Sequence, residues 1–284
     1  MSDFLIESPD DPRLDPYRDL KQPASRRQET FIAEGEKLVL RLVASRCQIE
    51  SILCTVAARE RLRQSLPSEV PVYVTSTPVI SGLIGFKFHR GVLACGVRPP
   101  QRSLDSICDA DSLSQRSLIV LCPEIRDPAN LGTIIRTAAA FGASGLVAGR
   151  EGTDPFSRRV LRTSMGSVLQ LPIVQSDDWI FVLNSLHRAK FESIAAVLDP
   201  AAEPLAAARR PPRVALVFGN EAEGLPAELV GLCQRRVTLP MAEGVDSLNV
   251  AVAAGIVLHH FTHHSPRARQ WPENPPGGAS QRSS

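Results

Sequence analysis

The sequence has few aromatic residues, no large excess of either charge and no long apolar run. Phe, Trp and Tyr make up 5% of the 284 residues, which argues against a surface that binds single strands through many stacked bases. The formal net charge is +2, which excludes a uniformly basic coat protein for nucleic acid but not a local basic face. No apolar run reaches the roughly 18 to 20 residues of a membrane helix, and the acidic N-terminus lacks the order of a secretory signal. We therefore expect a soluble, cytoplasmic protein.

The cysteines are scattered rather than paired. None belongs to a Cys-x-x-Cys motif, and most lie in apolar runs, which is typical of small buried residues in a reducing compartment. The six are Cys47, Cys54, Cys95, Cys108, Cys122 and Cys233. Near the end of the last expected helix, His259 and His263 are spaced to share a metal, as are His260 and His264. No acidic or cysteine residue accompanies them, so we interpret them as a solvated helix end and expect no metal.

The apolar fraction of 43% is sufficient for a core, and the length fits one large domain or two small ones. Composition shifts favour two domains, with an irregular Asp- and Pro-rich arm before them, a polar linker between them and a Pro-, Gly- and Ser-rich tail after them. We expect the arm at 1–20, the first domain at 21–100 and the linker at 101–116. The second domain is expected at 117–264 and the tail at 265–284.

The first domain reads as a small α/β unit. One helical pattern ends at residue 45 and a second covers 58–66. Runs rich in β-forming residues occupy 50–55, 70–75 and 91–99.

The second domain alternates strands with helices. Strands, several of them nearly all apolar, are expected at 117–125, 144–149, 171–174, 192–198, 213–220 and 235–240, and helices at 131–141, 156–165, 178–189, 227–233 and 248–263. This alternation predicts a parallel sheet covered by helices on both faces. Ligands bind such sheets at the carboxyl ends of the strands, so the residues just after each strand are the candidates for function.

Three of these junctions carry unusual residues. In DPANLGTIIRTAAAFG, Asn130 is placed to cap a helix, and Arg136 is a single charge among small and apolar residues. In VFGNEAEGLP, Glu221 lies at the mouth of a buried strand between two glycines. In LPMAEGVDSLNVAVAAGIVL, Ser247 is a good N-cap, and Asn249 stands in the first turn of an apolar helix, which it disfavours. The simplest alternatives are that Arg136 is a surface arginine, that the loop with Glu221 is a plain turn and that Ser247 is an ordinary N-cap.

The junctions lack the usual nucleotide fingerprints. No G-x-G-x-x-G follows a strand, and no G-x-x-x-x-G-K-[ST] is present, which argues against an ordinary dinucleotide site and against a P-loop.

In order and spacing across residues 117–260, the three junctions resemble the SpoU (TrmH-like) branch of the SPOUT RNA 2′-O-ribose methyltransferases. RTSMGSVLQLP, with Ser164 and Gly166, is similar to a less strict motif of that family. Segments within 14–98, among them RRQETFIAEGEKLV and HRGVLACG, resemble its L30e-like substrate-binding domain. The resemblance implies a parallel sheet with a C-terminal deep trefoil knot, a preceding L30e-like α/β domain, S-adenosylmethionine as methyl donor, RNA as substrate and a homodimer.

The resemblance also implies site residues. The polar active-site positions match Asn130, Arg136, Glu221, Ser247 and Asn249, and the donor-binding positions match Gly219, Asn220, Leu239, Met241 and Leu248. Proposals for the family have the residue that matches Arg136 act on the substrate hydroxyl, in some of them as a base. A guanidinium is almost never deprotonated in proteins, so we interpret Arg136 as a cation that stabilises the developing alkoxide, with the proton lost to water or phosphate. No metal is required.

Contacts with RNA are expected from the first domain and from basic loops near the donor site. The candidates for phosphate contacts are Arg26, Arg27, Lys87, Arg90, Arg158, Arg159 and Arg162, each of which is equally well explained as a solubilising surface charge. Ribosomal RNA is preferred to transfer RNA because the first domain resembles those of members that modify rRNA. Two alternatives stay open, a non-catalytic RNA-binding or ribosome-assembly factor and an α/β enzyme that uses another nucleotide.

Overall fold

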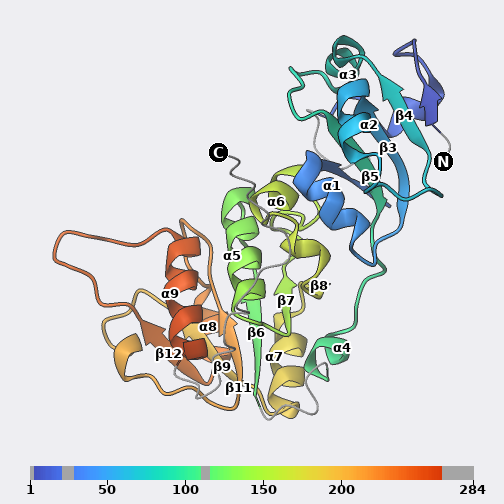
Figure 1. Cartoon of the computed structure of the whole chain (residues 1–284). Helices are drawn as coiled ribbons and strands as arrows, with labels where there is room; N and C mark the ends of the chain where they lie inside the picture. The colour runs from blue at the N-terminus through green and yellow to red at the C-terminus, as the bar shows by residue number, and fades with distance from the viewer. Residues whose placement is uncertain (1–2, 21–28, 110–115, 264–284) are drawn as a thin grey trace, which may run out of the picture.

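The computed structural model describes residues 3–20, 29–109 and 116–263, which form two sheets with helices packed against them (Figure 1). The larger sheet is wholly parallel, in the order β10-β12-β9-β11-β6-β7-β8. Its strands are β6 (Ser117–Cys122), β7 (Gly145–Ala148), β8 (Ile173–Gln175), β9 (Glu192–Ala196), β10 (Glu203–Pro204), β11 (Arg213–Val217) and β12 (Arg235–Thr238). The predicted parallel sheet is confirmed, and the two-residue strand β10 is additional.

Helices cover both faces of this sheet, as the alternation predicts. Along β6, Leu118 and Val120 belong to the same apolar cluster as α5, α6 and α9, whereas Ile119 and Leu121 belong to the cluster of α4, α7 and α8. The helices are α4 (Leu104–Cys108), α5 (Pro128–Ala140), α6 (Arg158–Thr163), α7 (Trp179–Arg188), α8 (Ala227–Leu232) and α9 (Val250–His263). The five helices expected in this domain are therefore all present.

The smaller sheet is mixed, in the order β1-β4-β3-β5-β2, with β5 antiparallel to both of its neighbours. Its strands are β1 (Asp3–Leu5), β2 (Thr30–Glu34), β3 (Ile49–Thr55), β4 (Val72–Thr75) and β5 (Val92–Val97), and its helices are α1 (Glu36–Val43), α2 (Val56–Leu62) and α3 (Thr77–Ile84). The three expected strands and two expected helices are present. Strand β2 and helix α3 were not predicted.

The expected irregular arm at 1–20 is wrong for its described part. Asp3–Leu5 is strand β1, which pairs in parallel with β4, and Pro12–Tyr17 is a 3-10 helix. Leu14 and Tyr17 are fully buried, and the Tyr17 hydroxyl is 2.8 Å from the Ser51 hydroxyl. The segment has no periodicity because its order comes from contacts with distant strands.

The expected linker at 101–116 is also partly wrong. Helix α4 lies within it, with Leu104, Ile107 and Cys108 buried in the cluster that contains α7 and α8. The apolar spacing of i, i+3 and i+4 is that of a helix, but it spans a single turn among polar residues. The tail expected at 265–284 lies outside the described residues.

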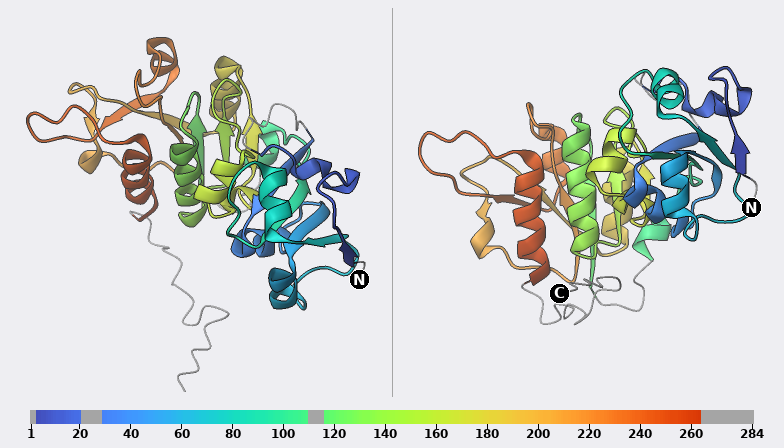
Figure 2. Two further views of the ribbon diagram at one scale, coloured as in Figure 1. Left: turned by 90° about the horizontal axis from the view of Figure 1, so that it is seen from above. Right: turned by 45° about the horizontal axis from the view of Figure 1, so that its top comes forward.

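The two sheets are joined by packing and by ion pairs. One apolar cluster extends from β2 and α1 to α5 and α6, and the rings of Phe31 and Phe156 are 5.3 Å apart. Arg98 of the first domain donates two hydrogen bonds to Asp154, of 2.9 and 2.6 Å. Figure 2 shows the two sheets side by side, with α6 facing the smaller one. We call this set of contacts the joint.

No helix in the described part of the chain is long and apolar enough to cross a membrane. Four of the six cysteines are buried, and Cys47 and Cys233 are partly exposed. Burial raises the pKa of Cys54 to about 12 and that of Cys108 to about 11. These two thiols are therefore protonated near neutral pH.

Candidate functional site

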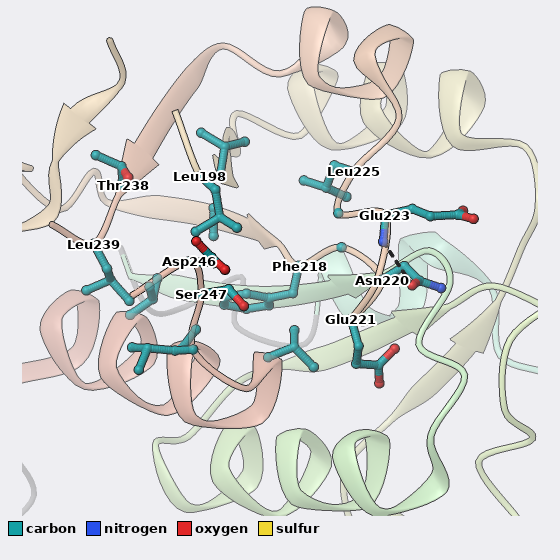
Figure 3. A pocket seen from close by; sticks show the side chains of 18 of the residues that line it. Leu198, Phe218, Asn220, Glu221, Glu223, Leu225, Thr238, Leu239, Asp246 and Ser247 are labelled. Carbon is teal, nitrogen blue, oxygen red and sulfur yellow. Dashed lines mark hydrogen bonds between the residues drawn. The ribbon is translucent and has the colours of Figure 1, made fainter. Parts of the chain in front are cut away.

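A cavity of about 500 Å³ opens at the carboxyl ends of β9, β11 and β12, next to the start of α9 (Figure 3). This is where ligands bind in open α/β sheets. Its walls are mainly apolar and include Leu198, Phe218, Val237, Leu239, Met241, Leu248 and Val250. The polar side chains that line it include Glu221, Glu223, Asp246 and Ser247.

The loop that follows β11 is closed on itself. The backbones of Asn220 and Gly224 exchange hydrogen bonds of 2.8 and 3.0 Å, and the Asn220 Oδ1 accepts from the backbone N–H of Ala222 at 2.8 Å. A Cβ on Gly219 would lie 2.3 Å from the carbonyl carbon of Gly224, so no side chain fits there. The loop is therefore compact, and the Glu221 side chain, although exposed, extends from it towards the helices beside the cavity (Figure 3).

A chain of hydrogen bonds joins the three junctions, and we call it the relay. The Asn130 Nδ2 donates to the Glu221 carboxylate at 2.7 Å, and the Asn249 Nδ2 donates to the Asn130 Oδ1 at 2.9 Å. The Asn249 Oδ1 in turn accepts from the backbone N–H groups of Ala251 and Val252, at 2.9 and 3.3 Å. Three polar residues from distant parts of the sequence thus fix one another at the edge of the cavity.

Two details of the prediction are corrected here. Helix α9 begins at Val250, so Asn249 is its N-cap rather than a first-turn residue, and the capping role expected of Ser247 belongs to Asn249. Ser247 is exposed and lines the cavity. The reason is that the chain has no regular secondary structure from Ser247 to Asn249, so the helix begins later than expected.

Arg136 is not part of the relay. It is exposed on α5 and makes no hydrogen bond or ion pair with any residue that the structure describes. It follows Asn130 by six residues, which is about 9 Å along the helix and on another face. The structure therefore joins Asn130, Glu221 and Asn249, places Ser247 on the adjoining wall, and leaves Arg136 apart from them.

The five residues expected to hold the methyl donor, Gly219, Asn220, Leu239, Met241 and Leu248, all line the cavity. The buried Asn220 side chain also shapes the loop. S-adenosylmethionine carries a sulfonium cation, and the charged side chains among the described lining residues are all carboxylates. Apolar walls, a glycine loop of close-packed backbone and an acidic rim therefore suit this donor.

The expected RNA-contacting residues have different surroundings. Lys87 and Arg162 are exposed and hold no ion pair with the described residues. Arg90 and Arg159 are about half exposed, and they pair with Glu34 at 3.3 Å and with Asp127 at 3.8 Å. Arg26 and Arg27 lie outside the described residues.

Arg158 has an internal role that the sequence did not indicate. Its guanidinium donates to the Glu34 carboxylate at 3.0 Å and to the Leu20 carbonyl at 2.6 Å, and it lies over the Phe86 ring at 4.7 Å. These partners all belong to the smaller sheet and its helices, so Arg158 contributes to the joint rather than to an open basic surface.

The cavity also contains residues that sequence reasoning missed. Asp246 and Thr238 line it, as does Leu198 just after β9. Asp246 had a signal, because it precedes Ser247 in the third junction. Leu198 and Thr238 carried no sequence signal for a binding site, since leucine and threonine are common at the ends of strands.

The chain matches the family model described as the SpoU rRNA Methylase family over residues 117–259. An uncharacterized tRNA/rRNA methyltransferase of Mycobacterium tuberculosis is 35% identical over 270 residues, covering 90% of this chain and 91% of that protein. The 23S rRNA (guanosine(2553)-2′-O)-methyltransferase RlmP of Bacillus subtilis is 28% identical, and the match covers 90% of this chain and 98% of that protein. A crystal structure of an AdoMet-bound rRNA methyltransferase from Sinorhizobium meliloti matches with a TM-score of 0.76 and 28% identity, covering 92% and 98%.

Proposed function

The chain belongs to the SpoU rRNA methylase family, and on that premise we propose that it transfers a methyl group from S-adenosylmethionine to a ribose 2′-OH of ribosomal RNA. The observation that carries the proposal is the relay of Glu221, Asn130 and Asn249 at the edge of a cavity that suits the donor. A protein that kept the fold without turnover has no need of three mutually fixed polar side chains at that place.

The bound donor would supply an electrophilic methyl group on a sulfonium. The apolar walls of the cavity exclude water from it, and the carboxylates of Glu221, Glu223 and Asp246 favour its positive charge. Since methyl transfer requires an in-line approach, the ribose oxygen must be held at the open side of the cavity. Ser247 and the relay residue Glu221 are polar groups of the cavity wall that are available to orient the ribose.

We assign to Arg136 the stabilisation of charge on the attacking oxygen. A guanidinium keeps its proton, so it acts as a cation and hydrogen-bond donor, and the hydroxyl proton leaves to water or to a phosphate. The exposure of Arg136 leaves its five donors available to RNA.

The Arg136→Ala variant tests this role. We expect methyl transfer to fall by about 100-fold to 1,000-fold, as when a single oxyanion donor is removed, with unchanged affinity for S-adenosylmethionine. Transfer of labelled methyl groups to rRNA and calorimetric titration with the donor measure the two quantities. Full activity in this variant would sink the assignment.

The proposed substrate class rests on the printed names of the relatives. RlmP is named for 23S rRNA and the Sinorhizobium protein for rRNA, whereas the mycobacterial protein is named for both tRNA and rRNA. Mapping of 2′-O-methyl groups in RNA from cells that lack the gene decides between them. A lost methyl group in tRNA alone contradicts the rRNA proposal.

The finer points of fold and assembly are also proposals. We infer a small L30e-like RNA-binding domain, a catalytic domain whose C-terminal segment is threaded into a trefoil knot, and action in the cytoplasm, where ribosomal RNA is found. Strand β12 lies between β9 and β10, and α9 returns to α5, which supports such threading.

We also propose that two copies pair through α5 and α9. A groove between these helices has a mainly apolar lining in which Val252 and Ile256 are 52% and 41% exposed, and Asn130 and Asn249 lie at it as well. Sedimentation of the full chain as a monomer at micromolar concentration would contradict this pairing.

A further inference from the structure

The cavity has a charge that does not suit RNA. Glu221, Glu223 and Asp246 line it, and no Lys or Arg is among the described residues that do so. An RNA backbone that brings a ribose to this opening brings phosphates towards carboxylates. A cation close to the opening is therefore required to make the approach favourable.

Such a cation lies on the loop between β6 and α5, which packs against the loop that follows β11. The Asn220 Nδ2 donates to the Glu124 carbonyl at 3.1 Å, and Asn130, at the start of α5, binds Glu221. Between Glu124 and Asn130 stands Arg126, whose side chain is 59% exposed. The segment that contains Arg126 is thus hydrogen-bonded on both sides, at Glu124 and at Asn130, to the loop that borders the cavity.

The backbone around Arg126 is also held from a third side. The Thr153 hydroxyl donates to the Arg126 carbonyl at 2.6 Å, and the Thr153 N–H donates to the Ile125 carbonyl at 2.9 Å. The loop therefore presents the Arg126 side chain from a fixed base, although the side chain itself is in solvent.

The Arg126 guanidinium is surrounded by carboxylates. It forms an ion pair with Glu124, which raises its pKa, and the more distant charges of Glu223 and Glu221 act in the same direction. Arg126 is therefore an exposed cation on the loop that is hydrogen-bonded to the acidic loop after β11. The next residue, Asp127, caps α5 and pairs with Arg159. A second half-exposed arginine therefore lies close to the loop that carries Arg126.

We propose that Arg126 is a positioning residue that binds a backbone phosphate of the substrate RNA beside the target ribose, with Glu124 as the partner that it leaves when RNA binds. This proposal rests on the proposed function. An exposed ion pair contributes at most about 1 kcal/mol, so leaving Glu124 costs little. A phosphate accepts two parallel hydrogen bonds from a guanidinium and replaces the lost carboxylate contact.

The alternatives in the same region are less suitable. Arg158 is engaged in the joint. Arg136 lies further along α5, towards the body of the helix, and we assign it to the reacting oxygen. Arg126 is instead in the loop, where the backbone on either side of a bound ribose would pass.

Two variants and a matched control test the proposal. Arg126→Ala removes the cation, and Glu124→Gln keeps the size of its partner but releases the guanidinium. Arg236→Ala is the control, because Arg236 is 48% exposed, pairs with one carboxylate, Asp199 at 2.9 Å, and is not among the described residues that line the cavity. Binding of a short 5′-labelled RNA oligonucleotide is measured by fluorescence anisotropy without donor, from about 50 to about 200 mM salt.

For Arg126→Ala we expect about ten-fold weaker RNA binding and a slope of log K against log salt that is shallower by about 0.7 to 1. With unmodified 23S rRNA transcript as substrate, KM should rise while kcat and donor affinity stay near the wild-type values. Arg126→Lys should recover part of the affinity, Glu124→Gln should bind at least as tightly as the wild type, and Arg236→Ala should change nothing.

Wild-type RNA affinity and salt slope in Arg126→Ala would overturn the proposal, as would an effect confined to kcat or one shared by Arg236→Ala. The proposed function fails in a different way, when the wild-type protein methylates neither rRNA nor tRNA. Because RNA binding is measured without turnover, the two failures are distinguished.

Discussion

The two sheets of this molecule divide the work between them. In the parallel seven-stranded sheet, loops at the carboxyl ends of β6, β11 and β12 converge on one cavity and one relay. In the mixed five-stranded sheet, β5 runs against its neighbours, so the strands do not all end at one edge. Parallel order collects functional loops at one edge of a sheet, whereas mixed order distributes the loops over both edges.

The charges follow the same division. The described residues that line the cavity carry carboxylates, whereas the smaller sheet meets the larger one through Glu34 and Arg98, which hold Arg158 and Asp154. The chemistry should thus be sensitive to changes at the cavity, and the orientation of the RNA-binding surface to changes at the joint. Three substitutions test this division, in order of decreasing effect.

Gly219→Ala should strongly weaken donor binding. The added Cβ would lie 2.3 Å from the Gly224 carbonyl carbon and 2.5 Å from the Leu225 nitrogen, and since both are backbone atoms the loop must move. We expect affinity for S-adenosylmethionine to fall by about 100-fold, or about 2.7 kcal/mol, in calorimetric titration. Gly231→Ala in α8 is the control, because its Cβ meets nothing within 4 Å. Donor affinity equal in the two variants would contradict the close-packed loop.

Arg158→Ala should loosen the joint without changing donor affinity. It leaves the buried Glu34 carboxylate with only its longer contact to Arg90. We expect the free energy of unfolding to fall by about 2 kcal/mol, less than for a fully buried pair because Arg158 is 23% exposed, and Tm to fall by about 4 to 8 °C.

Arg90→Ala is the matched control for that loss, since Arg90 binds the same carboxylate but is 48% exposed. Methyl transfer to rRNA should decrease in Arg158→Ala if the first domain binds RNA as proposed, because that domain is then no longer held in place against the second. If calorimetry finds equal Tm values for the two variants, Arg158 has no special part in the joint.

Asp11→Asn should have the smallest effect, and only in acid. The Arg13 guanidinium lowers the pKa of Asp11 from its ordinary value of 3.8 to about 2. This carboxylate therefore stabilises the fold above pH 3.8, and the contribution is lost as pH falls towards 2. Asn still accepts the Arg13 N–H as the N-cap. Unfolding of the variant should depend less on pH between about 4 and 2, with methyl transfer unchanged. Lower activity at neutral pH would link the N-terminal segment to the chemistry.

How far the sequence predicts the structure also differs between the sheets. The central strands β6, β7 and β11 of the parallel sheet are buried on both faces, so they appear as apolar runs such as SLIVLC and were found. Segment 3–17 was missed because Leu14 and Tyr17 are buried by distant partners, which leave no local pattern.

The site shows the same limit at the scale of single residues. Asn130 was expected as a helix cap, and Glu221 and Asn249 were noticed as polar residues next to apolar segments; the resemblance then grouped the three as site positions. Their mutual hydrogen bonds were not predictable, since they depend on how three loops meet. The roles of Arg158 and Arg126 were missed for a similar reason. A surface arginine looks the same in sequence whether it faces solvent, another domain or a carboxylate.

The joint limits how this chain can be recombined with its relatives. A crossover placed in residues 101–116 appears natural, because this segment lies between the two sheets. It would separate Glu34 from Arg158 and Arg98 from Asp154, so that each charge would meet a partner inherited from another lineage. The portable module is therefore larger than the first sheet. It includes the segment from Asp154 to Thr163, although that segment belongs to the other sheet in the linear sequence.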